Sequence, residues 1–244
     1  MNTRTRIAVS AFALVSAALS GVVSADTVDL RYTGSGRGRI VQISHPGGGA
    51  NVFSGQLTHN IINPVGSQAA AIAGVHNTFC TDVSQYVTRD FRSYTLTNIA
   101  NVPNVSPMGT ARAAAIQDVY DYAGVNILSG ATTNDAAAAF QLLVWEIIHD
   151  YSPTGGLASL SLSSGAFRAA TTSGNALGTG IMSQFNTFVA SIGAVNATRF
   201  NLVGLTNGEA QDQIVALAIP APGPVALAGL GALCFAGRRR GKTV

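Results

Sequence analysis

Hydrophobic and polar residues alternate with a period of two near the start of the chain. This alternation predicts β-strands at residues 27–34, 38–44 and 51–57. The intervening Gly-rich stretches, 34–38 and 45–50, have the composition of turns. We therefore expect the body of the protein to begin as a sheet of short strands.

Patterns typical of strands also occur later in the chain. A less regular strand region covers residues 77–96, and two strands are predicted at 197–205 and 211–219. Asn207–Gly208, between the last two, is a hairpin signal because this pair readily adopts the positive φ angles of a tight turn.

The middle of the chain changes to a helical period. Residues 110–124 predict a helix with Thr110 as its N-cap and Gly124 as its stop. Its apolar stripe contains Ile116, Val119, Tyr120 and Ala123.

Two further helices are predicted. One follows Asn134, its expected N-cap, ends before Pro153, and is apolar on nearly every side from Ala136 to Ile148, which is typical of a buried helix. The other covers residues 180–193, and its apolar face consists of Ile181, Phe185, Phe188 and Ile192.

Strands at both ends with helices between them predict one α+β domain. We expect it to occupy residues 26–219, with a sandwich- or barrel-like sheet built from the N- and C-terminal strands and a helical middle. This length is ample for a single hydrophobic core.

The first 25 residues have the order of a secretory signal peptide. Arg4 and Arg6 precede an apolar run from Ile7 to Val23, and small residues lead to a cleavage site after Ala25. The alternative is an uncleaved membrane helix.

Residues 220–244 form a second targeting segment. Pro220, Ala221 and Pro222 precede an apolar helix at 223–237, which ends at a basic cluster of Arg238, Arg239 and Arg240. Fifteen helical residues span only about 22 Å, against a hydrocarbon core of roughly 30 Å. The arginines predict a cytoplasmic C-terminus and an external body.

This order of motif, apolar helix and basic end resembles the PEP-CTERM sorting signal, with Ala221 where that signal usually has Glu. The resemblance implies processing by an exosortase, a membrane protease of exopolysaccharide-producing bacteria. A plain single-span anchor is the alternative.

Removing both segments changes the charge. The whole chain has a formal charge of +3, but residues 26–219 contain eight basic residues and all 11 acidic ones, which gives −3. No basic stripe with interleaved aromatics is present, so we expect no nucleic-acid binding.

Two short motifs within residues 26–219 contain residues that could react with each other. Phe79 and Cys80 stand in TFCTD, and Gln141 and Trp145 stand in AFQLLVWEIIHD. They resemble the Cys–Gln phrases of bacterial thioester surface domains, although Phe140 and Leu143 occupy positions that are usually Thr and Ala. The resemblance implies a bond between Cys80 and Gln141.

The chemistry of these residue types agrees with that resemblance. A thiolate that attacks a glutamine carboxamide expels ammonia and leaves an internal thioester. Gln141 and Trp145 are four residues apart on a helix, so the indole could cover the bond. His76 or His149 could supply a proton. The alternative is that Cys80 is a small buried hydrophobe and Gln141 a hydrogen-bonded core amide.

Other motifs are weak. Glu146 and His149 have the E-x-x-H spacing of di-iron bundles, but no second such motif appears. The glycines of 34–38 lack Rossmann spacing, and the four histidines have no ligand spacing. Cys234 lies in the apolar tail and is not expected to pair with Cys80. We expect no metal and no cofactor.

We therefore expect an exported cell-surface or extracellular-matrix protein with a structural or adhesive role, and no enzyme. Its partners would be the exosortase, the membrane through the C-terminal helix, and an extracellular polysaccharide or cell-surface ligand. A carbohydrate-binding or hydrolytic domain acting on exopolysaccharide is the alternative.

Overall fold

A computed structural model describes residues 25–195 and 197–219 of the protein. Several sequence-based predictions concern residues outside these ranges: the signal segment up to Ser24, the sorting motif Pro220–Pro222, Cys234, and the basic cluster Arg238–Arg240. The C-terminal hydrophobic helix belongs to the same group.

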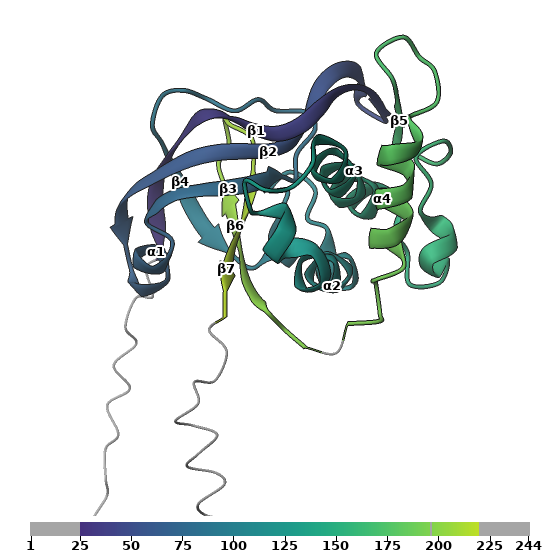
Figure 1. The fold of residues 1–244 in the computed structure, drawn as a ribbon. Coiled ribbons are helices and arrows are strands. Elements are labelled where there is room, and N and C mark those ends of the chain that lie inside the picture. The colour runs from purple at the N-terminus through teal and green to yellow at the C-terminus, as the bar shows by residue number, and fades with distance from the viewer. Residues whose placement is uncertain (1–24, 196, 220–244) are drawn as a thin grey trace, which may run out of the picture.

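The described residues form a mixed α+β fold, as predicted, around a seven-stranded antiparallel sheet (Figure 1). Its order is β2-β3-β7-β6-β4-β1-β5, and β1 also pairs with β2. This extra pairing closes six strands into a ring, so the sheet is barrel-like. The strands are β1 (Thr27–His45), β2 (Gly48–Val65), β3 (Gly74–Cys80), β4 (Arg92–Thr97), β5 (Arg168–Ala170), β6 (Phe200–Thr206) and β7 (Gln213–Ala218).

The helical elements are α1 (Ser67–Ala71), η1 (Ile99–Asn101), α2 (Gly109–Ile127), α3 (Asn134–Asp150), η2 (Gly156–Ser159) and α4 (Thr179–Val189). The helices α2, α3 and α4 gather on one side of this sheet, and α1 lies apart from them (Figure 1). Two cores result. The larger lies between the sheet and α2, α3 and α4. The smaller is built from strand residues together with Ala69 and Ile72 around α1 and Ala210 of the β6–β7 loop.

The predicted turn at 34–38 is wrong. β1 runs without interruption from Thr27 to His45, paired with β2, and register shifts absorb the glycines near Tyr32–Gly34 and Ser35–Gly38. A side chain at Gly38 would meet the Ser54 carbonyl oxygen at 2.4 Å, so the glycine permits close pairing with β2. The predicted turn at 45–50 is confirmed and reduces to Pro46–Gly47.

Both predicted ends of the first helix are also wrong. α2 begins at Gly109 after Met108, which makes no side-chain cap bond, and it continues through Gly124 to Ile127. A Cβ on Gly124 would lie 2.6 Å from the Phe200 ring. Gly124 therefore allows β6 to approach the helix and does not stop it.

The second helix matches the prediction except at its cap. Thr133, not Asn134, is the N-cap of α3, and its hydroxyl oxygen accepts a hydrogen bond from the Ala136 N–H at 3.1 Å. Every residue from Ala136 to Ile148 is buried, as predicted. α3 packs against the β1–β2 hairpin, where the Ser54 hydroxyl donates to the Ala138 carbonyl at 2.9 Å.

The strand region predicted at 77–96 is only partly correct, because β3 ends at Cys80, β4 begins at Arg92, and residues 81–91 lie in neither strand. The other predictions agree with the fold. The apolar residues expected on the third helix are buried, although α4 ends at Val189 and Ile192 follows it. β6 and β7 form the predicted hairpin. Its turn is held by the Asn207 side-chain oxygen, which accepts from the backbone N–H groups of Glu209 and Ala210.

Candidate functional site

The two candidate thioester residues come from different elements and meet in the larger core. Cys80 is the last residue of β3, and Gln141 lies in the second turn of α3. Cys80 is 3% exposed and Gln141 is fully buried. Their meeting depends on the long-range packing of α3 on the sheet, because 61 residues separate them.

The Gln141 carboxamide is held on the backbone of Cys80 by two hydrogen bonds. The Cys80 N–H donates to Gln141 Oε1 at 3.0 Å, and Gln141 Nε2 donates to the Cys80 carbonyl at 2.9 Å. The Cys80 Sγ atom lies 3.5 Å from Oε1. The thiol and the carboxamide are thus neighbours, and a backbone N–H already polarises the carbonyl.

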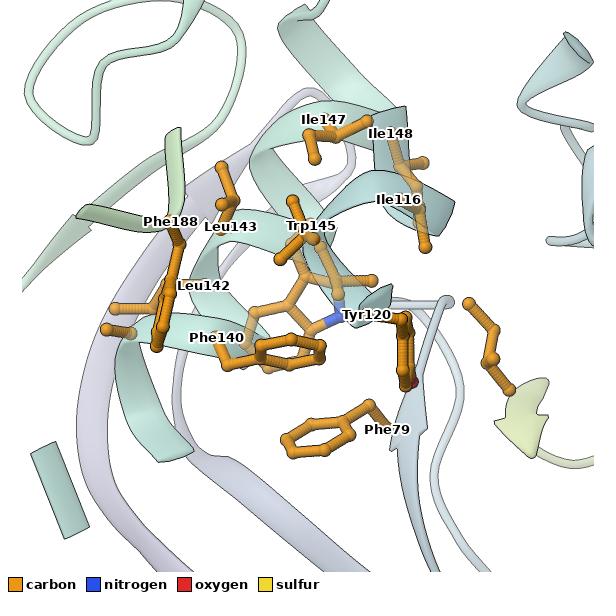
Figure 2. Packing of buried hydrophobic residues seen from close by; sticks show 14 of the residues in the cluster. Phe79, Ile116, Tyr120, Phe140, Leu142, Leu143, Trp145, Ile147, Ile148 and Phe188 are labelled. Carbon is orange, nitrogen blue, oxygen red and sulfur yellow. The ribbon is translucent and has the colours of Figure 1, made fainter. Parts of the chain in front are cut away.

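Aromatic packing fixes the segments that carry these two residues (Figure 2). The rings of Phe79 and Phe140, each preceding a candidate residue, have centroids 4.7 Å apart. Tyr120 of α2 packs edge-on against Phe140 at 4.9 Å and against Phe79 at 6.4 Å. Phe79 and Phe140 therefore help to hold Cys80 and Gln141 in place through their packing on each other and on Tyr120.

A cavity of about 260 Å³ reaches Cys80 and Trp145. One wall comes from the β1–β2 hairpin and another from the segment that follows Cys80. Tyr86 lies at this cavity and is 80% exposed, so we take it as part of the rim. This cavity brings open space next to Cys80, although Cys80 itself is 3% exposed.

Trp145 lies one turn beyond Gln141 on α3 and forms part of the cavity wall. Its side chain is 2% exposed, and its indole Nε1–H has no hydrogen-bond acceptor. The indole packs near Phe167, with ring centroids 6.0 Å apart. Trp145 and Cys80 both line the cavity, and Gln141 is hydrogen-bonded to Cys80. This arrangement is consistent with the prediction that Gln141 and Trp145 share a helix face.

Unpaired polar atoms concentrate around this region. In the described ranges, the buried side-chain atoms without a hydrogen-bond partner are Thr81 Oγ1, Asp82 Oδ2, Tyr120 OH, Trp145 Nε1 and Glu146 Oε2. Two of them follow Cys80 directly, two lie on α3 just beyond Gln141, and Tyr120 packs on the phenylalanines beside the site. Such groups are costly to bury without a partner.

While it is not bonded to Gln141, the Cys80 sulfur keeps its proton at neutral pH. Burial raises the pKa of Cys80 far above its ordinary value; the nearby Trp145 indole opposes this, and the negative charge of Asp82 adds to it. A thiol is a weak nucleophile, so bond formation with Gln141 requires the sulfur to lose its proton as it attacks.

The two histidines considered as proton sources lie elsewhere. His149 stacks on Phe167, with centroids 5.7 Å apart and planes 5° from parallel, and His45 lies beside it at 6.0 Å. Burial, and then the charge of His45, lower the pKa of His149. His76 is half-buried on β3, and burial lowers its pKa. Neither contributes to the cavity wall.

The E-x-x-H pair is also explained structurally. Glu146 is fully buried, and its Oε1 accepts from the Ser161 N–H at 2.7 Å. Across residues 25–195 and 197–219, no group of three or more His, Cys, Asp or Glu side chains is arranged to hold a metal ion.

Sequence reasoning missed the contribution of Tyr120, Asp82 and the cavity wall. Tyr120 was predicted only as a core residue, from its place on the helical stripe. Asp82 stands two residues after Cys80, but no spacing rule identifies an unpaired buried carboxylate. The cavity wall depends on how the β1–β2 hairpin folds over α3.

Comparisons of the chain with protein-family models, with curated proteins and with solved structures found no match. A search of the described helices found none that is both long and apolar enough to cross a membrane.

Proposed function

We propose that Cys80 and Gln141 form an internal thioester, which this exported protein uses for covalent attachment at the cell surface or in the extracellular matrix. The observation that carries the proposal is the docking of the Gln141 carboxamide on Cys80, with Sγ 3.5 Å from Oε1. Burial of both residues supports the persistence of such a bond, because water is kept from an acyl electrophile.

The bond-forming step balances without a cofactor. The Cys80 sulfur attacks Gln141 Cδ, the S–C bond forms, and the thiol proton passes to Nε2 as the C–N bond breaks and ammonia leaves. The Cys80 N–H, which already donates to Oε1, would stabilise negative charge on that oxygen in the transition state.

Intact mass spectrometry of the native protein tests the thioester. We expect the mature protein to be lighter by about 17 Da than its sequence requires, the mass of one ammonia. Cys80→Ser and Gln141→Ala should each show the full sequence mass and should not incorporate an added amine. A native protein of full mass with a thiol that is free after unfolding would refute the proposal.

Export and sorting are part of the proposal and rest on the terminal sequences. We infer cleavage after Ala25 and exosortase processing near Pro220, with the C-terminal helix in the membrane beforehand. The same intact-mass measurement also shows where the N-terminus and the C-terminus have been cleaved. A mature C-terminus at Val244 would favour a plain anchor over sorting.

A second hollow favours polysaccharide recognition as the alternative function. It has a volume of about 670 Å³ and lies between the β1–β2 hairpin, β5 and the loop after β5. Its polar wall contains Gln42, Asn51, Arg168 and Asn175, and no acidic residue. Amides and a guanidinium suit hydroxyl and carboxylate groups, whereas glycoside hydrolysis ordinarily needs a pair of acids.

A glycan array distinguishes these possibilities. Binding without turnover that is lost in Arg168→Ala would support recognition in this hollow, with the exposed Arg199→Ala as the matched control. Hydrolysis of a polysaccharide would contradict the assignment of the protein as a non-enzyme.

A further inference from the structure

The β1–β2 hairpin has an unpaired edge where it borders the cavity that reaches Cys80. β2 pairs with β1 along most of its length, but its pairing with β3 begins only at Leu57. Residues 50–53 of β2 lie outside this second pairing, and all four line the cavity. Within the described ranges, their only backbone–backbone hydrogen bonds are those with β1. This stretch of β2 therefore has a neighbouring strand on one side only.

The unpaired edge begins where β2 and β3 separate. The last pair is Leu57 with Thr78, and an unbroken ladder would next pair Gly55 with Cys80. Instead, the Gln141 carboxamide accepts from the Cys80 N–H and donates to the Cys80 carbonyl. These are the two bonds that a peptide group of β2 would otherwise make. A side chain thus ends the ladder at Cys80, and the cavity lies where the two strands separate.

The alternation of the backbone identifies the groups on the free edge. Successive residues of a strand direct their N–H and C=O groups to opposite sides. The Leu57 carbonyl faces β3, where it accepts from the Thr78 hydroxyl at 3.3 Å. In steps of two from Leu57, Phe53 and Asn51 face the same way, and the residues between them face β1.

The hairpin turn gives the same assignment from the other end. Pro46–Gly47 is a two-residue turn, and the residues that flank it, His45 and Gly48, are paired. In such hairpins the flanking residues are hydrogen-bonded to each other, so Gly48 directs its backbone groups towards β1. Ala50 and Val52 then do the same, which again leaves Asn51 and Phe53 for the free edge.

The edge also lacks the features that usually protect an unpaired strand. Native edges are commonly blocked by charged side chains, by proline or by a covering segment. Residues 48–55, GGANVFSG, contain no charge and no proline. Asn51 is exposed and Phe53 is half-buried, so solvent reaches this part of β2. The edge is therefore open to a further strand.

We propose that this edge binds an extended segment of a protein partner as an added β-strand, held by the outward backbone groups of Asn51 and Phe53. Main-chain hydrogen bonds supply the affinity in this mode of recognition, and pockets for alternate side chains supply the specificity. The cavity beside the edge has a volume of about 260 Å³, and Ile43, Val52 and Trp145 contribute to its wall. It thus has room for aliphatic side chains on one face of the added strand.

This inference goes beyond the proposed thioester and does not depend on it. The probe is the peptide acetyl-Glu-Thr-Val-Thr-Val-Thr-Glu-amide, which alternates in the required way and has no amine that could be acylated. Residue-resolved amide hydrogen exchange in the native protein follows its binding. Before addition, the Asn51 and Phe53 amides should exchange faster than those of Ala50 and Val52. At saturation the peptide should slow Asn51 and Phe53 about tenfold.

Two N-methylated versions of the peptide provide the sharper test, because an added strand uses only one of its edges. Each version carries methyl groups on alternate nitrogens, one version for each edge. One should lose binding and the other should retain it. In the protein, Asn51→Pro removes one outward donor and should weaken binding roughly fivefold, whereas the matched Asn51→Ala should bind as the native protein does.

Three results would overturn the inference. The first is unchanged exchange at Asn51 and Phe53 with millimolar peptide, and the second is equal binding of both methylated versions. The third is a dimer of the native protein that Asn51→Pro dissociates, since the edge would then belong to a second copy of the chain. None of these results changes the expected loss of ammonia, which tests the thioester separately.

Discussion

Burial of Glu146 makes the stability of the fold depend on pH. Its side chain is fully buried on α3, Oε1 has one donor in Ser161, and Oε2 has none. Burial raises the pKa of Glu146 from 4.5 to about 8; the Ser161 N–H opposes this rise and the charge of Asp150 adds to it. The folded protein therefore keeps a proton that the unfolded chain has already lost.

The sign and size follow from linkage. Between pH 4.5 and about 8 the folded state binds more protons at Glu146 than the unfolded state, so this contribution to stability falls as pH rises. The two pKa values differ by about 3.5, which corresponds to at most about 5 kcal/mol. Water and relaxation around a buried charge reduce such values, so we expect about 2 kcal/mol.

Glu146→Gln isolates this effect because it keeps an acceptor for Ser161 and removes the charge. Urea unfolding can be followed by the fluorescence of Trp145, the single tryptophan, which is 2% exposed. Wild type and Glu146→Gln should have similar stability at pH 5, and the variant should be about 2 kcal/mol more stable at pH 9. Glu209→Gln, whose parent side chain is 80% exposed, is the control. Parallel pH profiles for wild type and Glu146→Gln would refute the reasoning.

Two further predictions concern helix geometry. Gly124→Ala should destabilise the protein by about 1–3 kcal/mol, because the new Cβ meets Phe200 at 2.6 Å, although helix propensity alone predicts the opposite sign. Urea unfolding checks this, and a more stable Gly124→Ala would contradict the close approach. Thr133→Ala should cost about 1 kcal/mol through loss of the cap to Ala136, and Asn134→Ala should cost less. Equal losses would contradict the assigned cap.

The class of fold was predictable because its strongest signals are local. Alternation with a period of two and the apolar run from Ala136 to Ile148 report burial directly. The errors arose where a residue type has two uses. Glycines at 34–38 and 124 were interpreted as a turn and a stop, but Gly38 and Gly124 permit close approach to Ser54 and Phe200. A single sequence does not reveal the opposing atom.

The sequence pointed to the two candidate residues but not to the cavity beside them. The motifs around Cys80 and Gln141 pointed to two residues that the fold brings into contact, and their chemistry stays a proposal. The cavity depends on the β1–β2 hairpin, whose far half extends beyond the ring of strands to cover α3 (Figure 1). No pattern in β1 or β2 alone indicates which side chains meet there.

Burial of Cys80 has opposite consequences before and after bond formation. It raises the thiol pKa, which makes the free sulfur a poor nucleophile towards anything except a group already held beside it, and Gln141 is held by two hydrogen bonds. In the proposed thioester, the same burial keeps water from the acyl group. An environment that makes the free thiol unreactive towards other groups would thus preserve the bond once it has formed.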